Sequence, residues 1–202
     1  MFSTVTATAT EFVYEDMGVR AKLKFVTPLL MDDPDVLSAP VTYVSLTTES
    51  VDGKEHEIIT HFSASSQLTY SGAEGKPLIW DTFDTKGLKT AYVGRREQKP
   101  LSHSGDHITI DWGYAYLAAI DGVQYADECL RGEKSGAVEA DKPLSYSLLL
   151  AYDDVASINY FGRLCRAWYA RNGATILDAI RTFDERRDEL MAACRALGET
   201  LK

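Results

Sequence analysis

The chain of 202 residues changes its hydrophobic period once, close to residue 172. Before that point apolar and polar residues alternate, as where Val5, Ala7 and Ala9 are separated by threonines. A period of two is typical of strands that bury one face. After Asn172-Gly173 the apolar residues recur at steps of three and four, which is typical of a helix. The sequence therefore predicts a β-sandwich body at 1–172 and a C-terminal helical segment at 173–202.

The body contains several strand candidates joined by turn signals, with no helix between them. This order favours an antiparallel β-sandwich, so the expected fold class is mainly β and supersandwich-like. Glu15-Asp16-Met17-Gly18 predicts the turn of a first hairpin. Asp52-Gly53 predicts the tight turn of a second hairpin, between strands at 41–46 and 56–62. Further strands are expected at 78–82, 88–94, 108–118 and 146–152, and turns at 71–75 and 131–136.

One helix is predicted from Thr175 to Leu197. Thr175 and Asp178 have the spacing of a capping-box variant at its start, and Gly198 is expected to cap its end. The apolar stripe must be buried against another surface. Its members are Ile176, Ile180, Phe183, Leu190, Cys194 and Leu197.

Charge argues against a polyanion as partner. Lys and Arg number 21 against 30 Asp and Glu, so the net charge is -9, and we expect neither a nucleic-acid partner nor a membrane partner. The one candidate basic stretch, 163–171, is interleaved with Leu164, Trp168 and Tyr169. We interpret it as a packed segment with extended arginine stems. No apolar run is long enough for a membrane span.

The cysteines and histidines give no metal or cofactor motif. Three widely spaced cysteines without a Cys-x-x-Cys pair predict neither a disulfide framework nor a zinc ribbon, which favours a reducing, cytoplasmic compartment. The start of the chain lacks the pattern of a signal peptide, although export of a longer parent protein stays open. His56 and His61 would lie on opposite faces of a strand. His103 and His107 flank Ser104-Gly105-Asp106, which is either an imidazole and carboxylate pair or, as we prefer, an ordinary turn. We expect no metal and no cofactor.

Two segments are unusual enough to be candidate sites. In 106–116 an acid stands beside a tryptophan on a strand, and in 150–162 an apolar strand ends in two acids before a Tyr-Phe-Gly. Successive side chains of a strand point in opposite directions, which argues against a paired-carboxylate mechanism. In one interpretation an Asp accepts backbone donors and the aromatic rings fill the core. In the other, these loops line a pocket or interface of a neighbouring domain. The candidate residues are Asp111, Trp112, Tyr114, Asp153, Asp154, Asn159 and Tyr160, and none is expected to be catalytic.

At these segments the chain resembles the N-terminal β-sandwich region of bacterial and fungal glutaminase A-like proteins. The motifs that carry the resemblance lie in the same order and at similar spacing, and together they cover almost the whole chain. They are Val26-Thr27-Pro28-Leu29-Leu30, Ala39-Pro40-Val41-Thr42-Tyr43-Val44-Ser45-Leu46, Asp52-Gly53-Lys54-Glu55-His56, Phe62-Ser63-Ala64-Ser65, Gly105-Asp106, Ile110-Asp111-Trp112-Gly113-Tyr114, Leu150-Ala151-Tyr152-Asp153-Asp154 and Ser157-Ile158-Asn159-Tyr160-Phe161-Gly162.

The resemblance implies a modular protein. In such proteins a sandwich precedes a large helical domain that is similar to an (α/α)₆ toroid, and the segment 173–202 would be the linker helix into it. The activity implied is hydrolysis of glutamine to glutamate and ammonia, with the active site expected largely in that helical domain. Since the helical domain is absent from this chain, we expect the chain alone to be non-catalytic and to have that domain as its partner.

Two alternatives stay open. Sandwiches often bind glycans, so the chain could be a carbohydrate-binding module if Trp80, Trp112 and Trp168 are exposed; fold analogy alone supports this. A second copy could pack on the helix from Thr175 to Leu197 if part of its apolar stripe is exposed.

Overall fold

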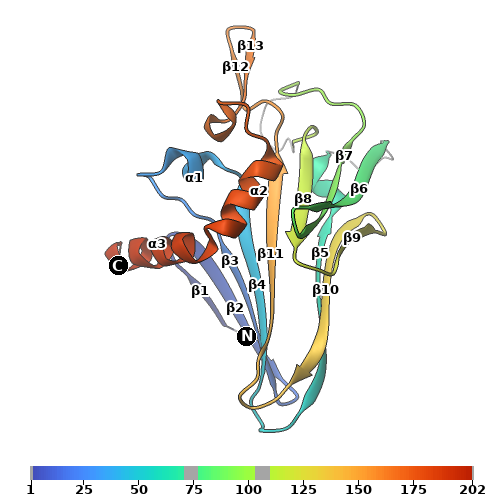
Figure 1. Ribbon diagram of the computed structural model, residues 1–202, viewed down its shortest axis with the longest axis vertical. Helices are drawn as coiled ribbons and strands as arrows, with labels where there is room; N and C mark the ends of the chain where they lie inside the picture. The colour runs from blue at the N-terminus through green and yellow to red at the C-terminus, as the bar shows by residue number, and fades with distance from the viewer. Residues whose placement is uncertain (1, 71–76, 103–109, 202) are drawn as a thin grey trace.

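The mainly β fold class is confirmed. The computed structural model describes residues 2–70, 77–102 and 110–201 (Figure 1). In these residues a large antiparallel sheet has the strand order β1-β2-β3-β4-β11-β8-β7-β6, and a small one has the order β5-β10-β9. The large sheet consists of β1 (Phe2–Val5), β2 (Ala9–Asp16), β3 (Val19–Val26), β4 (Val41–Ser50), β6 (Leu78–Thr85), β7 (Leu88–Arg95), β8 (Tyr114–Ala119) and β11 (Leu144–Asp153). The small sheet consists of β5 (His56–Ser65), β9 (Val123–Ala126) and β10 (Cys129–Val138).

The remaining elements are short. They are α1 (Pro34–Ser38), α2 (Ile176–Glu185), α3 (Arg187–Thr200), the hairpin strands β12 (Ile158–Tyr160) and β13 (Arg163–Cys165), and the 3₁₀ turns η1 (Ser66–Thr69) and η2 (Trp168–Ala170).

The large sheet is the middle of three layers. Along β4, Tyr43 belongs to the core shared with the helices, whereas its neighbour Val44 belongs to the core shared with the small sheet. On β11, Leu149 and Leu148 divide in the same way. Both strands bury side chains on both faces, which explains the apolar run Leu148-Leu149-Leu150-Ala151 in β11. In Figure 1, α2 crosses β11 and β4 on the face opposite the small sheet.

Five of the six side chains of the helical stripe are buried within the chain. Ile176, Ile180, Phe183, Leu190 and Cys194 all lie in the core on the helical face of the large sheet. Leu197, the sixth member, is partly exposed, so packing of a second copy on this helix stays a prediction.

Two helices replace the single predicted one. The capping box of Thr175 and Asp178 is confirmed, but the chain bends at Arg186, whose φ and ψ are -96° and 13°. At the bend the buried Tyr43 hydroxyl donates a 2.6 Å hydrogen bond to the Phe183 carbonyl oxygen, so this carbonyl keeps a donor where the helix ends. Gly198 lies inside α3, and the prediction that it caps the helix is wrong.

The Asp52-Gly53 turn does not form a hairpin. It is a corner that carries the chain from β4 in the large sheet to β5 in the small sheet, so the second predicted hairpin is wrong. The Asp52 carboxylate accepts hydrogen bonds from the Lys54 amide at 3.0 Å, the Ser50 hydroxyl at 3.2 Å and the His56 ring at 2.9 Å. The same residues that favour a tight turn therefore stabilise a corner between sheets.

The first hairpin is confirmed, because Met17 and Gly18 connect the paired strands β2 and β3 with positive φ angles of 48° and 79°. The alternating run at the start of the chain is interrupted, since β1 ends at Val5 and β2 begins at Ala9.

The turn expected at 131–136 is wrong, because these residues form the middle of β10. A Cβ at Gly132 would come within 2.8 Å of the Leu148 side chain, so glycine allows the two sheets to approach. The strand expected at 108–118 begins only at Tyr114. The turn at 71–75 and the loop with His103 and His107 lie outside the described residues.

Acid should weaken the Asp52 corner. The hydrogen bond from His56, followed by that from the Lys54 amide, lowers the pKa of Asp52 from 3.8 to about 2. Because this pKa is depressed on folding, the ionised carboxylate stabilises the fold above about pH 4, and its contribution disappears as the pH falls to about 2. In urea unfolding, Asp52→Asn should therefore have a lower free energy of unfolding than the unsubstituted chain. The difference should be constant near about pH 6 and should shrink between about pH 4 and 2. Asp141→Asn, at an exposed acid between β10 and β11, is the control; equal pH dependence for both variants would contradict the prediction.

Candidate functional site

The candidate residues gather where β7, β8 and β11 meet one end of the large sheet. Asp111 precedes β8, and its side chain is 4% exposed, while that of Arg95 at the end of β7 is 12% exposed. The Arg95 guanidinium donates to the Asp111 carboxylate, and also to the Asp111 carbonyl oxygen at 3.2 Å. A buried carboxyl group requires such a partner, and Arg95 provides it.

A side-chain amide joins the loop after β7 to the segment before β8. The Gly113 amide donates to Gln98 Oε1 at 2.5 Å, while Gln98 Nε2 donates to the Arg95 carbonyl oxygen at 2.7 Å. Gly113 has a φ of 92°, and a Cβ there would collide with the Asp153 carbonyl oxygen. From β11, the Tyr152 hydroxyl donates to the Trp112 carbonyl oxygen. The backbone around Trp112 is therefore held from two sides.

Asp153 and Asp154 form the turn that ends β11. Asp153 pairs with Tyr114 across the sheet, and its Oδ1 accepts a hydrogen bond from the Val155 amide at 3.0 Å. The Asp154 carbonyl oxygen accepts from the Ala156 amide at 2.6 Å, and Val155 has a φ of 62°. The Asp153 side chain thus makes the backbone contact proposed in the structural interpretation of the sequence.

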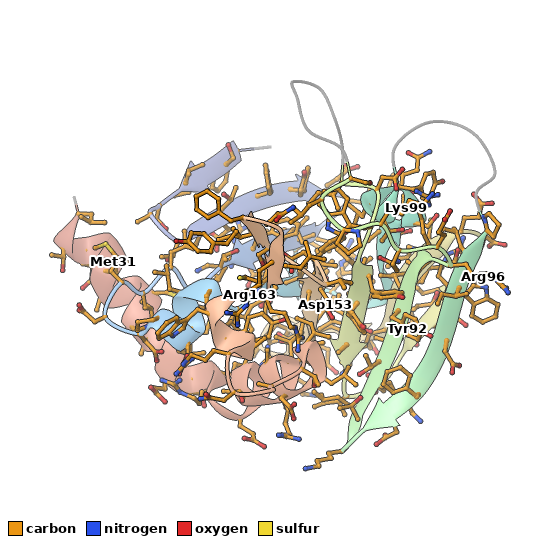
Figure 2. All side chains as sticks on the ribbon, turned by 90° about the horizontal axis from the view of Figure 1, so that it is seen from above. Met31, Tyr92, Arg96, Lys99, Asp153 and Arg163 are labelled. Carbon is orange, nitrogen blue, oxygen red and sulfur yellow. The ribbon has the colours of Figure 1, made fainter. Side chains whose placement is uncertain are left out.

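Beside this turn, four rings lie on β6, β7 and β8, and we call Phe83, Tyr92, Tyr114 and Tyr116 the aromatic face; Tyr116 also packs against the core that contains the α2 side chains. Tyr92 is central, with ring centroids 5.7 Å from Tyr116, 5.9 Å from Tyr114 and 6.1 Å from Phe83. Seen from above, Asp153 lies between Arg163 and Tyr92 (Figure 2). Because Tyr114 is paired with Asp153 across the sheet, the aromatic face adjoins the acidic end of β11.

Burial keeps the phenols near this end protonated. Burial is the main cause, and nearby carboxylates the second, of the raised pKa of Tyr116, Tyr152 and Tyr169. For Tyr169 the pKa rises to about 12, with Asp153 as the largest charged contributor. At neutral pH these phenols are protonated, and the Tyr152 hydroxyl uses its proton in the hydrogen bond to the Trp112 carbonyl oxygen.

Asn159 and Tyr160 lie elsewhere, on the β12–β13 hairpin that projects beyond the rest of the molecule (Figure 1). The Asn159 side chain accepts a hydrogen bond from the Gly162 amide at 2.8 Å, and the Tyr160 side chain is exposed. The packed interpretation of 163–171 is wrong in part: Leu164 and Trp168 are more than half exposed, whereas Tyr169 and Ala170 are buried. This hairpin shows its apolar side chains to solvent because no other element covers them.

The structure thus brings together five of the seven predicted residues. The Tyr152 hydroxyl is within electrostatic reach of Asp111, Asp153 and Asp154, and Trp112 and Tyr114 adjoin them. Arg95 and Gln98, which hold this end together, were not among the predicted residues. The sequence signal was Asp111 itself, because an acid between apolar strand residues requires a cationic partner if it is buried. Nothing close to Asp111 in the sequence identified Arg95 as that partner.

Metal binding has no support in the part of the chain that the structure describes, where no group of three or more His, Cys, Asp and Glu side chains could hold an ion. His56 contacts Asp52, whereas His61 is 3.7 Å from Glu133, so the two histidines do not share a site. Among the same described residues, no helix is long and apolar enough to cross a membrane.

The comparisons with known proteins identify a family. A family model described as a domain of unknown function (DUF5127) matches residues 8–134, so the chain belongs to that family. The curated protein Glutaminase A from Aspergillus oryzae (strain ATCC 42149 / RIB 40) is 30% identical over 103 residues, which are 51% of this chain and 15% of that protein. The chain therefore matches only a small share of that relative's length.

Among solved structures, one titled "Putative kojibiose phosphorylase from human microbiome" is similar, with a TM-score of 0.45 and 9% identity. The similarity covers 95% of this chain and 21% of that one. At this level it carries no information on substrate.

Loss of the buried carboxylate charge should affect stability. Asp111→Asn leaves the Arg95 guanidinium buried without its counter-charge, and removal of one partner of a buried pair costs about 3–5 kcal/mol. We expect a loss of this size in the free energy of unfolding, measured with urea. The double variant Asp111→Asn, Arg95→Met should lose less than the sum of the two single changes. Unchanged stability of Asp111→Asn would contradict a structural role for the pair.

Proposed function

We propose that this chain is a non-catalytic β-sandwich domain of an amidohydrolase-like protein that acts on glutamine. In this proposal it packs on a helical catalytic domain and helps to shape that domain's pocket. The observation that carries the proposal is that two of the candidate acids make contacts that stabilise the fold. Asp111 binds Arg95, and Asp153 binds the backbone of its own turn. A general acid or nucleophile needs a group that is available to substrate.

The sequence similarity supports the choice of reaction. The 30% identity to Glutaminase A is distant, but it covers half of this chain, and the family match covers residues 8–134. Because the aligned part is 15% of that relative, most of such a protein would lie outside the sandwich. We therefore assign the chemistry to the remainder, with 1–172 as the sandwich and 173–202 as the link to the helical domain.

The seven candidate residues receive two roles in this proposal. Asp111, Trp112, Tyr114, Asp153 and Asp154 form a rigid end of the sheet, and Asn159 and Tyr160 belong to a hairpin that extends from it toward the partner domain. Rigid support of this kind is what positions a neighbouring pocket with the accuracy that catalysis needs.

Ammonia release tests the proposal directly. The 202-residue chain and the longer polypeptide that contains the helical domain should be assayed side by side with glutamine, using a coupled enzymatic readout for ammonia. We expect turnover by the longer polypeptide and none by the 202-residue chain above the buffer blank. Turnover by the short chain alone would refute the non-catalytic role, and inactivity of the longer polypeptide would refute the assigned reaction.

A second candidate function, glycan binding, has one specific observation in its favour. Trp80 is 56% exposed and stacks on Tyr125 with ring centroids 5.1 Å apart, which makes a flat aromatic surface that joins β6 to β9. Exposed aromatic rings of this kind can stack on sugar rings. Trp112 is buried, and the Arg171 guanidinium lies over the Trp168 ring, so these two are weaker platforms.

A glycan array separates this candidate from the first. If Trp80 is a sugar platform, the chain should bind at least one glycan, and Trp80→Ala should abolish that signal because the stacking surface is lost. Trp168→Ala serves as the matched control and should retain binding. An array without hits, or hits that survive Trp80→Ala, would eliminate the glycan function at this position.

A further inference from the structure

The β12–β13 hairpin carries the strongest unexplained feature of the described surface. Phe161 at its tip is 94% exposed and Tyr160 is 64% exposed. Ile158 and Leu164 on its strands, and Trp168 just after it, are each more than half exposed. We call these five side chains the apolar tip. Apolar side chains scattered singly are normal on a surface, but a cluster of large ones marks an interaction site.

The backbone of the apolar tip is ordered before any partner binds. Three residue pairs join β12 to β13, and the Ser157 amide donates to the Cys165 carbonyl oxygen at 2.9 Å. The turn is closed by the hydrogen bond from the Gly162 amide to Asn159, with φ angles of 48° at Phe161 and 88° at Gly162. A two-residue turn with both φ angles positive matches the twist of the strands. Such preorganisation lowers the entropic cost of docking.

Charge defines the partner's chemistry. Arg163 is exposed and, among the described residues, has no carboxylate within ion-pair distance, whereas Arg171 is held by Asp35. The chain as a whole has a net charge of -9, so this tip is a locally cationic, aromatic projection on an acidic molecule. Trp, Tyr and Arg are the side chains that dominate binding energy at protein interfaces. An apolar pocket with a carboxylate at its rim is the complementary surface.

The tip is too small to form a stable interface alone, since a standard one buries about 800 Å² on each partner. The remainder of a stable interface must therefore come from other parts of the sandwich surface. An anionic membrane is disfavoured because the acidic chain repels it and the tip offers few unpaired cations.

We propose that the apolar tip is the docking element by which this domain inserts into an apolar, carboxylate-rimmed pocket elsewhere in the longer polypeptide. This inference rests on the proposed function, in which the sandwich has such a partner in the same protein. Phe161 is the central anchor, and Arg163 pairs with the acid at the rim. The tip thereby fixes the sandwich relative to the partner.

Hydroxyl-radical footprinting of the 202-residue chain and of the longer polypeptide tests this. Oxidation of Phe161 and Tyr160 should fall by about tenfold in the longer polypeptide, because docked anchors are desolvated. Met17, which is 87% exposed in the β2–β3 turn at the other end of the large sheet, is the internal control and should not change (Figure 1). Equal oxidation of the tip in both samples would overturn the proposal.

A variant gives a second, independent readout. In the longer polypeptide Phe161→Asp should return Tyr160 oxidation to the level of the short chain, because the anchor is lost. Asp tolerates the left-handed conformation at this position. The free energy of unfolding of the 202-residue chain should therefore be the same with and without this substitution. Ile59→Asp, at an exposed site on β5, is the matched control and should leave Tyr160 protected. Protection of Tyr160 that survives Phe161→Asp would overturn the assignment of the anchor.

Other occupants give distinguishable results. Protection of the tip in the short chain that grows with protein concentration would identify a second copy, and protection by vesicles of phosphatidylcholine and phosphatidylglycerol would identify a membrane. Either outcome overturns the proposal. Ammonia release with an exposed tip would remove this inference and leave the proposed function standing. A protected tip without ammonia release would refute the proposed reaction and leave the docking of the tip standing.

Discussion

The structure depends on two strands, β4 and β11, that are buried on both faces at the centre of the large sheet. Tyr43 and Leu149 face the helices, whereas Val44 and Leu148 face the small sheet. Each strand therefore links two hydrophobic cores, and neither core can loosen without exposing the other side of the same backbone. The helices are needed for this arrangement because they cover the face of the sheet that the small sheet leaves open. The Tyr43 hydrogen bond to the Phe183 carbonyl shows how closely the helical layer is attached.

Local patterns in the sequence predicted the strands, turns and helix starts better than they predicted which strands lie next to each other. The period of two, the capping box at Thr175 and the β2–β3 turn depend on residues close together in the chain, and these were confirmed. The Asp52-Gly53 signal was read as a hairpin because it specifies a change of direction but not which strand lies alongside. Its carboxylate bonds are satisfied equally well in a corner between sheets. The glycines of β10 were read as a turn, although at Gly132 the cause is close sheet packing.

The candidate site was predictable only in outline. The sequence identified abrupt strand ends at Asp111 and Asp153, and the structure places both at the same end of the sheet. It could not identify Arg95, which lies 16 residues before Asp111 and meets it only because β7 and β8 are neighbours. The solvent exposure of the segment 163–171 was also not predictable from the sequence. Leu164 and Trp168 belong to a segment with the composition of a packed one, but both are exposed; for Leu164 the reason is that β12 and β13 form a separate two-stranded sheet.

The two halves of the candidate region are mechanically related. The turn that the Asp153 side chain closes onto Val155 connects β11, a strand of both cores, directly to β12. Trp168 follows the hairpin, and η2, which it begins, is attached to α1 by the hydrogen bond from the Tyr169 amide to the Ser38 hydroxyl and by the ion pair of Arg171 with Asp35. The hairpin is thus anchored at both ends to rigid elements. A partner that holds its tip also positions the sandwich, because the turn between β11 and β12 is closed by the hydrogen bonds of the Val155, Ala156 and Ser157 amides. Rigid attachment of this kind suits a domain that shapes a neighbouring pocket better than one tethered loosely to it.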